Sequence, residues 1–234
     1  MSAQVTRKIL AMGGGGFSME PGNLLMDNFF FSLTGKPNPK VCFIGTASGD
    51  SDSYTDRFYE YMKDHDITPS HLSLFKSPNG SLRDYVLSKD VLYVGGGNTR
   101  NLMVLWKEWG LDKIITEAYQ KGVVLGGVSA GGLCWFEEGV TDSITGKLSK
   151  LSCMNLLSGS FCPHYDGEEE RRPSYVRLMK EENLIPGYAC DDSAAVYFEN
   201  EKIVEAVCSV STASAYKVSS TSEEKIPTRF LAKV

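Results

Sequence analysis

The sequence predicts an α/β protein in which a mostly parallel β-sheet has helices on both faces. Short apolar runs alternate with longer segments of helical periodicity, which is the pattern that βαβ units produce. Several apolar runs end in glycine-rich turns, and such turns gather at the carboxyl edge of a parallel sheet. The chain has 234 residues, enough to bury one sizeable core, and no linker rich in proline, glycine and serine divides it. We therefore expect a single domain over residues 1–234.

The clearest elements lie in the first half of the chain. We expect strands at Lys8–Met12, Lys40–Ile44, Leu72–Phe75 and Asp90–Val94, of which the third is weak. We expect helices at Asn23–Leu33, Ser53–Asp64, Arg100–Trp109 and Asp112–Lys121. The second of these is amphipathic, because Tyr54, Phe58 and Tyr61 fall on one helical face.

After Phe136 the pattern is less regular. Short strands are predicted at Ser158–Cys162, Gly187–Cys190, Ala194–Phe198 and Ile203–Ala206, with a helix over Ser174–Glu181. The polar segment Ser219–Lys225 predicts a loop before the final run, Arg229–Val234.

Composition and charge are those of an ordinary soluble protein. Hydrophobic residues make up 42% of the chain, charged residues 23%, and the formal net charge is -5. The negative charge argues against nucleic acid and anionic membranes as partners, and no apolar run approaches membrane-spanning length. The polar N-terminus lacks a signal-peptide pattern, and the six cysteines form no C-x-x-C pair. These features predict free thiols, mostly buried, in a cytoplasmic protein.

The most informative segment reads G-V-S-A-G over residues 127–131 and follows the apolar run at 123–125. A serine between two glycines, after a short strand and before a helical pattern, is typical of a nucleophile elbow. Glycine has no Cβ, so the turn can tighten and the hydroxyl of Ser129 can project into a cleft. A helix from Ala130 would turn free N–H groups and the positive end of its dipole toward an oxyanion. The segment therefore predicts acyl-transfer chemistry.

A serine hydroxyl needs a base to attack a carbonyl at neutral pH, and the chain has three histidines. His65 lies at a charged helix end and His71 lies in the weak strand far upstream. His164 follows a predicted strand and precedes a polar loop, so it is the candidate base.

The base in turn needs a carboxylate to orient it, and Asp191 and Asp192 follow the strand predicted at 187–190. Only one of them should face His164, because successive strand residues point in opposite directions, and the residues alone do not choose. The order serine, histidine, acid differs from the order in α/β-hydrolases, which indicates another α/β scaffold.

An oxyanion hole needs two N–H donors. The N–H of Ala130 follows the serine directly, and the glycine triplet at 95–97 allows a second donor to approach the substrate closely. The elbow, this triplet and the turn at 45–47 should all lie at the carboxyl edge of the sheet.

These residues together resemble peptidase E, the aspartyl dipeptidases, with cyanophycinase as a relative. The resemblance rests on V-G-G-G-N-T at 94–99, G-V-S-A-G at 127–131, P-H-Y at 163–165 and an acid after a short strand. Each piece is weak alone, but the combination is specific, and it extends over most of the chain to about Phe198. It implies a flavodoxin-like fold related to class I glutamine amidotransferases, with serine where those enzymes have cysteine.

The resemblance also implies roles for individual residues. Ser129 would be the nucleophile and His164 the base, while Gly97 and Ala130 would donate to the oxyanion. It favours Asp192 as the acid, at a position where the dipeptidase has glutamate.

Substrate recognition is implied in the same way. The dipeptidases recognise an N-terminal aspartate partly through an arginine after the catalytic histidine, and Arg172 is the best match here. The alternative for Arg172 is local pairing with glutamate at the start of a surface helix. Asn98, within the glycine-rich signature, is a further candidate for substrate binding.

Three other motifs have simpler explanations. The glycines at 13–16 lack the spacing of a dinucleotide-binding loop. The acidic pair around Ser51 fits a helix N-cap better than a metal site. Cys162 and Cys190 lie near the candidate base and acid, but neither stands in an elbow, and core packing explains them better.

We therefore expect a cytoplasmic serine hydrolase for short peptides, in particular dipeptides with an N-terminal aspartate, that needs no metal or organic cofactor. Its partner would be the peptide substrate, and we expect it to bind neither nucleic acid nor membranes. A homodimer is compatible with the sequence. One alternative is a cyanophycinase-like hydrolase of β-aspartyl isopeptide bonds. The other is a non-catalytic, ligand-binding member of the amidotransferase-like fold.

Overall fold

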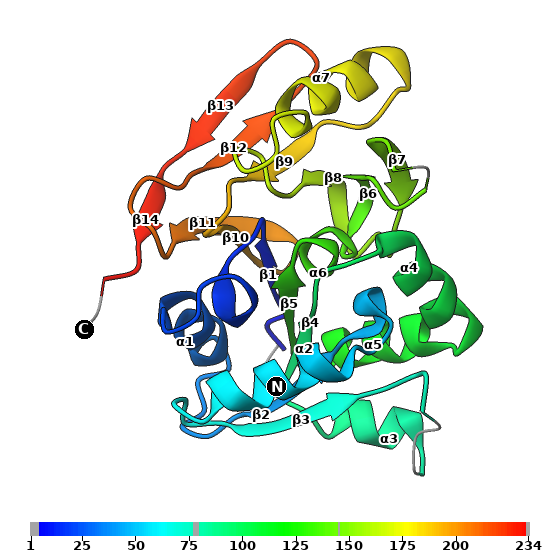
Figure 1. Cartoon of the computed structure of the whole chain (residues 1–234), viewed down its shortest axis with the longest axis vertical. Coiled ribbons are helices and arrows are strands. Elements are labelled where there is room, and N and C mark those ends of the chain that lie inside the picture. The colour runs from blue at the N-terminus through cyan, green and yellow to red at the C-terminus, as the bar shows by residue number, and fades with distance from the viewer. Residues whose placement is uncertain (1–4, 77–79, 145, 233–234) are drawn as a thin grey trace.

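The computed structural model describes residues 5–76, 80–144 and 146–232 (Figure 1). Its strands are β1 Lys8–Met12, β2 Lys40–Ile44, β3 Thr68–Leu72, β4 Val91–Val94, β5 Val124–Val128, β6 Phe136–Thr141, β7 Ser149–Ser152, β8 Leu157–Cys162, β9 Gly187–Cys190, β10 Ala194–Glu199, β11 Lys202–Cys208, β12 Ala215–Val218, β13 Glu223–Ile226 and β14 Thr228–Phe230. Its helices are α1 Leu25–Ser32, α2 Asp52–Met62, α3 Leu82–Leu87, α4 Thr99–Glu108, α5 Leu111–Gln120, α6 Ala130–Leu133 and α7 Arg171–Glu181, with short 3₁₀ turns η1 Gly16–Ser18 and η2 Thr46–Ser48.

The larger sheet has eight strands in the order β14-β11-β10-β1-β5-β4-β2-β3. From β1 to β3 all neighbours are parallel, whereas β10 pairs antiparallel with both β1 and β11. The prediction of a mostly parallel sheet is confirmed. Because β1, β5, β4 and β2 run in the same direction, the loops after them leave the sheet at one edge.

Helices cover both faces of this sheet, because its central strands are apolar on both sides. Alternate residues of β1 illustrate the division. Ile9 and Ala11 belong to the core that α3, α4 and α5 cover. Leu10 and Met12 belong to the core that α1 and α2 cover. In Figure 1, α4 and α5 lie to the right of the central strands and α1 to the left.

A smaller sheet of six strands has the order β13-β12-β9-β8-β6-β7 and lies at the top of Figure 1 with α7 against it. Tyr175 and Leu178 of α7 pack on Cys162 and Ala189 of its strands. Phe136 and Phe161 on its other face join the core of the larger sheet. The loops after β8 and β9 carry the candidate base and the two candidate acids toward the elbow.

The structure corrects two of the predicted elements. The strand expected at Leu72–Phe75 is β3, which ends at Leu72 and contains Pro69. A proline is tolerated there because β3 is an edge strand. The polar segment expected as the loop Ser219–Lys225 is partly β13, whose exposed glutamates and lysine suit the edge of the smaller sheet.

Several elements were not predicted at all. They are α3 and the strands β6, β7 and β12, which are short or carry few apolar residues. The final run Arg229–Val234 contributes only Phe230 and Arg229 to β14, and residues 233–234 lie outside the described ranges, as do residues 1–4. Among the helices of the described ranges, none combines the length and the apolar character needed to cross a bilayer.

Candidate active site

Ser129 stands alone on the sharp turn between β5 and α6, with φ 56° and ψ -112°. This backbone conformation is rare for a residue with a side chain and is typical of strained functional turns. The turn is fixed by the Ser129 N–H, which donates to the carbonyl of Met12 over 3.1 Å. Side chains at Gly127 or Gly131 would collide with the carbonyl of Val94. The expected elbow geometry is therefore present, and both glycines are needed to form it.

The helix after the elbow starts at Ala130, as expected, and is short. α6 spans only Ala130–Leu133, a single turn, so its summed dipole is small. An oxyanion at this position would therefore be stabilised by individual N–H groups rather than by a helix dipole.

His164 and Asp192 are hydrogen-bonded to each other. Nδ1 of His164 lies 2.6 Å from Oδ1 of Asp192, and the two side chains are 15% and 30% exposed. A carboxylate at this distance accepts the Nδ1 proton, which leaves Nε2 as the basic nitrogen. His164 has φ 52°, so the loop after β8 turns sharply to present the ring.

Asp191 points away from this pair. Its Oδ2 accepts from the N–H of Ser214 at 2.9 Å and from the hydroxyl of Tyr216 at 3.4 Å, so it is bound within the smaller sheet. Burial, reinforced by the negative charge of Asp166, raises the pKa of Asp191 to about 6. Of the two adjacent acids, only Asp192 bonds to the histidine.

A cavity of about 350 Å³ brings the elbow and the histidine together. The described residues that line it are Gly97, Asn98, Ser129, Asp142, Ser143, His164, Glu168 and Arg171. Within the described ranges, no hydrogen bond joins the Ser129 hydroxyl to the His164 ring. Catalytic hydrogen bonds of this kind often tighten only when substrate is bound.

The backbone N–H groups of Gly97 and Ala130, which lie beside Ser129, have no acceptor among the described residues. Gly97 has φ 135°, and a Cβ there would collide with the carbonyl of Ala47. That carbonyl accepts instead from the N–H of Asn98 at 2.7 Å. The turn at 45–47 thus holds the glycine loop against the elbow, as the parallel sheet predicts.

Asn98 lines the cavity, but its side chain has structural partners. Its Oδ1 accepts from the N–H of Asn101 at 2.8 Å and caps α4, and its Nδ2 donates to the carbonyl of Ser143 at 3.2 Å. The Ser143 hydroxyl accepts from the N–H of Thr99 at 2.8 Å. These bonds tie the loop after β6 to the glycine loop.

The two adjacent arginines point to different places. Arg172 pairs with both carboxylate oxygens of Glu223 and stacks between the rings of Tyr165 and Tyr216, each 4.9 Å from its guanidinium. Arg172 therefore does not line the Ser129 cavity, contrary to the sequence interpretation. Arg171 does line it, because consecutive helical residues differ in direction by about 100°.

Arg171 is held rigidly and is only 4% exposed. Its Nε donates to Glu168 over 2.6 Å and one terminal nitrogen donates to the carbonyl of Val140 over 3.1 Å. Four residues of the cavity wall were not predicted from the sequence, namely Arg171, Glu168, Asp142 and Ser143. The spacing of Glu168 and Arg171, one helical turn apart, was an available signal for the first two, whereas nothing marked the loop after β6.

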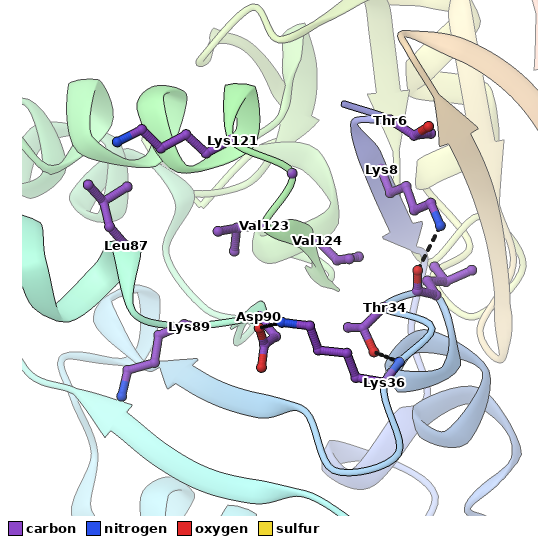
Figure 2. A pocket seen from close by; sticks show the side chains of 12 residues that line it. Thr6, Lys8, Thr34, Lys36, Leu87, Lys89, Asp90, Lys121, Val123 and Val124 are labelled. Atoms are coloured by element: carbon purple, nitrogen blue, oxygen red, sulfur yellow. Dashed lines mark hydrogen bonds and ion pairs between the residues drawn. The ribbon is translucent and has the colours of Figure 1, made fainter. Parts of the chain in front are cut away.

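A second hollow of similar size, about 340 Å³, lies at the opposite end of the sheet (Figure 2). Of the described residues, four lysines line it, namely Lys8, Lys36, Lys89 and Lys121. Three of them have polar partners, since Lys36 lies 2.5 Å from Asp90, Lys8 donates to the carbonyl of Leu33 and Lys121 pairs with Glu117. The ammonium of Lys89 lies 3.8 Å from the centre of the Tyr85 ring. The described residues that line this hollow include no histidine, cysteine or serine.

Comparison with known proteins decides the family. The sequence profile of peptidase family S51 matches residues 9–206. The chain belongs to peptidase family S51. It is 55% identical over 212 residues to the uncharacterized peptidase YgaJ of Bacillus subtilis (strain 168), covering 91% of this chain and 92% of that one. It is 27% identical over 188 residues to the uncharacterized peptidase Lmo0363 of Listeria monocytogenes, covering 77% and 90%.

Solved structures support the fold. A crystal structure from Listeria monocytogenes EGD-e described as a peptidase E protein aligns with a TM-score of 0.64 at 18% identity, covering 86% of this chain and 98% of that one. A peptidase from an acI-B1 Actinobacterium aligns with a TM-score of 0.73 at 16% identity, covering 95% and 94%. The resemblance to peptidase E and the flavodoxin-like α/β fold are confirmed.

Membership in family S51 makes the chain an enzyme, since the family consists of serine peptidases. It counts against the alternative of a non-catalytic binding protein. A thiol nucleophile is also disfavoured, because burial raises the pKa of Cys162 to about 12 and the thiol does not line the cavity.

Proposed function

We propose that this S51 peptidase hydrolyses short peptides, in particular dipeptides with an N-terminal aspartate, through Ser129, His164 and Asp192. The observation that carries the proposal is the cavity that a strained serine and a carboxylate-bound histidine line together. The substrate would be a small peptide of the cytoplasm. The free state of all six cysteines supports this reducing compartment.

Acylation begins when the Ser129 oxygen attacks the peptide carbonyl while Nε2 of His164 takes its proton. Asp192 holds the imidazole in the tautomer that can accept this proton and stabilises the imidazolium that forms. The negative charge on the carbonyl oxygen is stabilised by the N–H groups of Gly97 and Ala130. His164 then protonates the leaving amine as the C–N bond breaks.

Deacylation repeats the sequence with water. His164 removes a proton from water, the hydroxide attacks the ester carbonyl, and the same two N–H groups receive the charge. The ester bond to Ser129 breaks and His164 returns its proton to the serine oxygen. Residues of this chain carry every proton, so the scheme uses no metal or organic cofactor.

Two features support a short, acidic substrate. A volume of about 350 Å³ is at the lower end for ligand sites, which favours a dipeptide over a longer chain. Arg171 is a buried cation in the cavity wall, and its fixed guanidinium suits a substrate carboxylate. We therefore assign to Arg171 the role that the sequence analysis gave to Arg172, while Asn98 shapes the cavity through its capping bonds.

The test compares Ser129→Ala with Ser143→Ala, a change to the other serine of the cavity. Ser129→Ala should lose at least about 10³-fold in kcat/KM on aspartyl dipeptides with an unchanged circular dichroism spectrum, and Ser143→Ala should lose less than about tenfold. Full activity of Ser129→Ala would remove the nucleophile. Labelling by a fluorophosphonate, with a small probe as the control for access, should be confined to Ser129.

A panel of dipeptides tests the substrate. Peptides with an α-linked N-terminal aspartate should be the preferred substrates, and Arg171→Met should remove the preference for aspartate over asparagine. Preference for β-linked aspartyl peptides would instead establish the cyanophycinase-like isopeptidase. Arg172→Met is the matched control and should leave the preference unchanged.

A further inference from the structure

The acid of the proposed site stands on a tight turn between β9 and β10. The turn closes through the Ala194 N–H, which donates to the carbonyl of Asp191 over 3.2 Å, and Ser193 within it has φ 64°. The Asp192 carboxylate fits between two glycines, Gly14 and Gly167, because a Cβ at either would collide with it. The position of this carboxylate therefore depends on how the turn is held.

One side of the turn is fixed by the smaller sheet. The Asp191 N–H donates to the carbonyl of Ser214 over 3.0 Å, and the Asp192 N–H donates to Oδ1 of Asp166 over 2.8 Å. The other side faces the loop of residues 13–24 after β1. There the Ser193 N–H donates to the carbonyl of Gly14 over 3.2 Å.

Glu20 is the only side chain of that loop for which the described residues show bonds to the Ser193 hydroxyl. Its carboxylate also accepts from the hydroxyl of Ser209, at 3.1 and 3.0 Å from its two oxygens, and from Nδ2 of Asn23 at 2.6 Å. Ser209 is only 4% exposed, so the bonds to it are protected from water. Three donors from three segments thus converge on one half-buried carboxylate.

The glycine run at 13–16, which lacks the spacing of a cofactor loop, makes this arrangement possible. Gly15 has φ 98°, and a Cβ there would lie 2.7 Å from Oε1 of Glu20 and 3.1 Å from Cα of Ser193. A side chain would push the loop and the turn apart. Within this run, the lack of a side chain at Gly15 lets Glu20 reach the turn, and the lack of one at Gly14 leaves room for Asp192.

We propose that Glu20 is a positioning residue, which fixes the turn at 191–193 so that Asp192 stays within hydrogen-bond distance of His164. The inference rests on the proposed function of the His164–Asp192 pair. Glu20 does not line the cavity, so it contacts neither substrate nor reacting atoms. Its effect is on orientation, and an error of about 1 Å in a catalytic group can cost about 10²-fold in rate.

The experiment compares Glu20→Ala and Glu20→Gln with Glu201→Gln. Glu201 is a matched control because its carboxylate also accepts three bonds, two from Arg7 and one from Tyr119, at the other end of β1. Glu20→Ala should lower kcat about 10–100-fold with KM within about threefold, and Glu20→Gln should lose less because one oxygen acceptor remains. Glu201→Gln should keep the wild-type kcat.

A spectroscopic readout separates orientation from general loss of structure. The Nδ1 proton shared by His164 and Asp192 should give a far-downfield proton resonance, assigned by its absence in His164→Ala. Glu20→Ala should lose or broaden this resonance, and Glu201→Gln should retain it. This signal does not depend on hydrolysis. It therefore tests whether Glu20 fixes the turn at 191–193 even if Ser129→Ala shows that the proposed function is wrong.

An unchanged resonance or an unchanged kcat in folded Glu20→Ala would overturn the proposal, as would the same losses in Glu201→Gln. If Glu20→Ala does not fold, Ser193→Ala decides instead. This change removes the hydroxyl that donates to Glu20 and retains a Cβ at the same φ. It should broaden the resonance and lower kcat. A wild-type resonance and kcat in Ser193→Ala would contradict the role of Glu20.

Discussion

The two hollows at opposite ends of the larger sheet are alike in size and different in chemistry. Each encloses about 350 or 340 Å³. At the carboxyl edge, Ser129 and His164 have positive φ, and the N–H groups of Gly97 and Ala130 have no acceptor among the described residues. At the amino edge, none of the described non-glycine residues that line the hollow has positive φ, and Figure 2 shows Lys8 and Lys36 bonded to neighbours.

The contrast teaches that volume alone does not mark a site. Folding normally satisfies polar groups and relaxes the backbone. Strain and unsatisfied donors persist only where the surrounding structure enforces them, and such places are often functional. At the carboxyl edge, the enforcement comes from glycines that permit close approach of several backbone segments.

The sharpest test of this comparison concerns the two adjacent acids. Asp192→Asn should lower kcat about 10⁴-fold, because an amide favours the wrong tautomer of His164 and cannot stabilise an imidazolium. Asp191→Asn should lose less than about tenfold, since Asp191 bonds to Ser214 rather than to the histidine. Steady-state kinetics of the two variants check this. Equal losses of kcat in the two variants would mean that Asp191 and Asp192 do not differ in function as their hydrogen bonds indicate.

The oxyanion donors come next in size. Gly97→Ala should lower kcat about 10²–10³-fold, because the new Cβ collides with the Ala47 carbonyl and moves the N–H away from the reacting oxygen. Gly110→Ala is the control. It also places a Cβ at a positive φ, 65°, but that Cβ meets no atom within 4 Å, so the change should reduce stability and leave kcat unchanged. A similar kcat for both variants would remove Gly97 from the site.

Asp27, a fully buried acid of α1, predicts that the stability of the protein depends on pH. Burial raises the pKa of Asp27 to about 7, and neither oxygen has a partner among the described residues. The folded protein therefore holds this proton up to about pH 7, while the unfolded chain releases it near 3.8, so the free energy of unfolding falls as pH rises between these values.

Asp27→Asn removes that titration. It should raise the free energy of unfolding by about 1–3 kcal/mol at pH 8 and by little near pH 4. Urea unfolding at several pH values measures the difference. Parallel profiles for the two proteins would show that Asp27 does not titrate in this range.

The smallest effect is expected at the amino edge. Lys36→Ala breaks the pair with Asp90, in which the lysine is largely exposed, and should change stability by less than about 1 kcal/mol. Hydrolysis of aspartyl dipeptides should stay within about twofold of wild type. A large loss of activity would mean that the amino-edge hollow takes part in function and would break the comparison.

The sequence predicted the carboxyl edge well for a physical reason. Apolar runs that end in glycine turns report both the strand direction and the close approach that follows, so the elbow at Ser129 and the loop at Gly97 were readable. The smaller sheet was harder, because strands such as β13 are polar at the edge and carry no alternating pattern.

Choices between neighbouring residues were beyond the sequence. Arg171 and Arg172 differ only in helical phase, and the direction of α7 relative to the cavity depends on its packing against the smaller sheet. Asp191 and Asp192 likewise differ only in which side of a turn they occupy. Glu20 gave no signal, since its partners Ser193 and Ser209 are far from it in the chain.

The central claim is that Ser129 forms a covalent acyl-enzyme. The most direct measurement is mass spectrometry of the protein after rapid acid quench of turnover on an activated aspartyl substrate. We expect an added aspartyl group on the peptide that contains Ser129, and its absence in Ser129→Ala. An adduct on another residue, or active turnover in Ser129→Ala, would contradict the account.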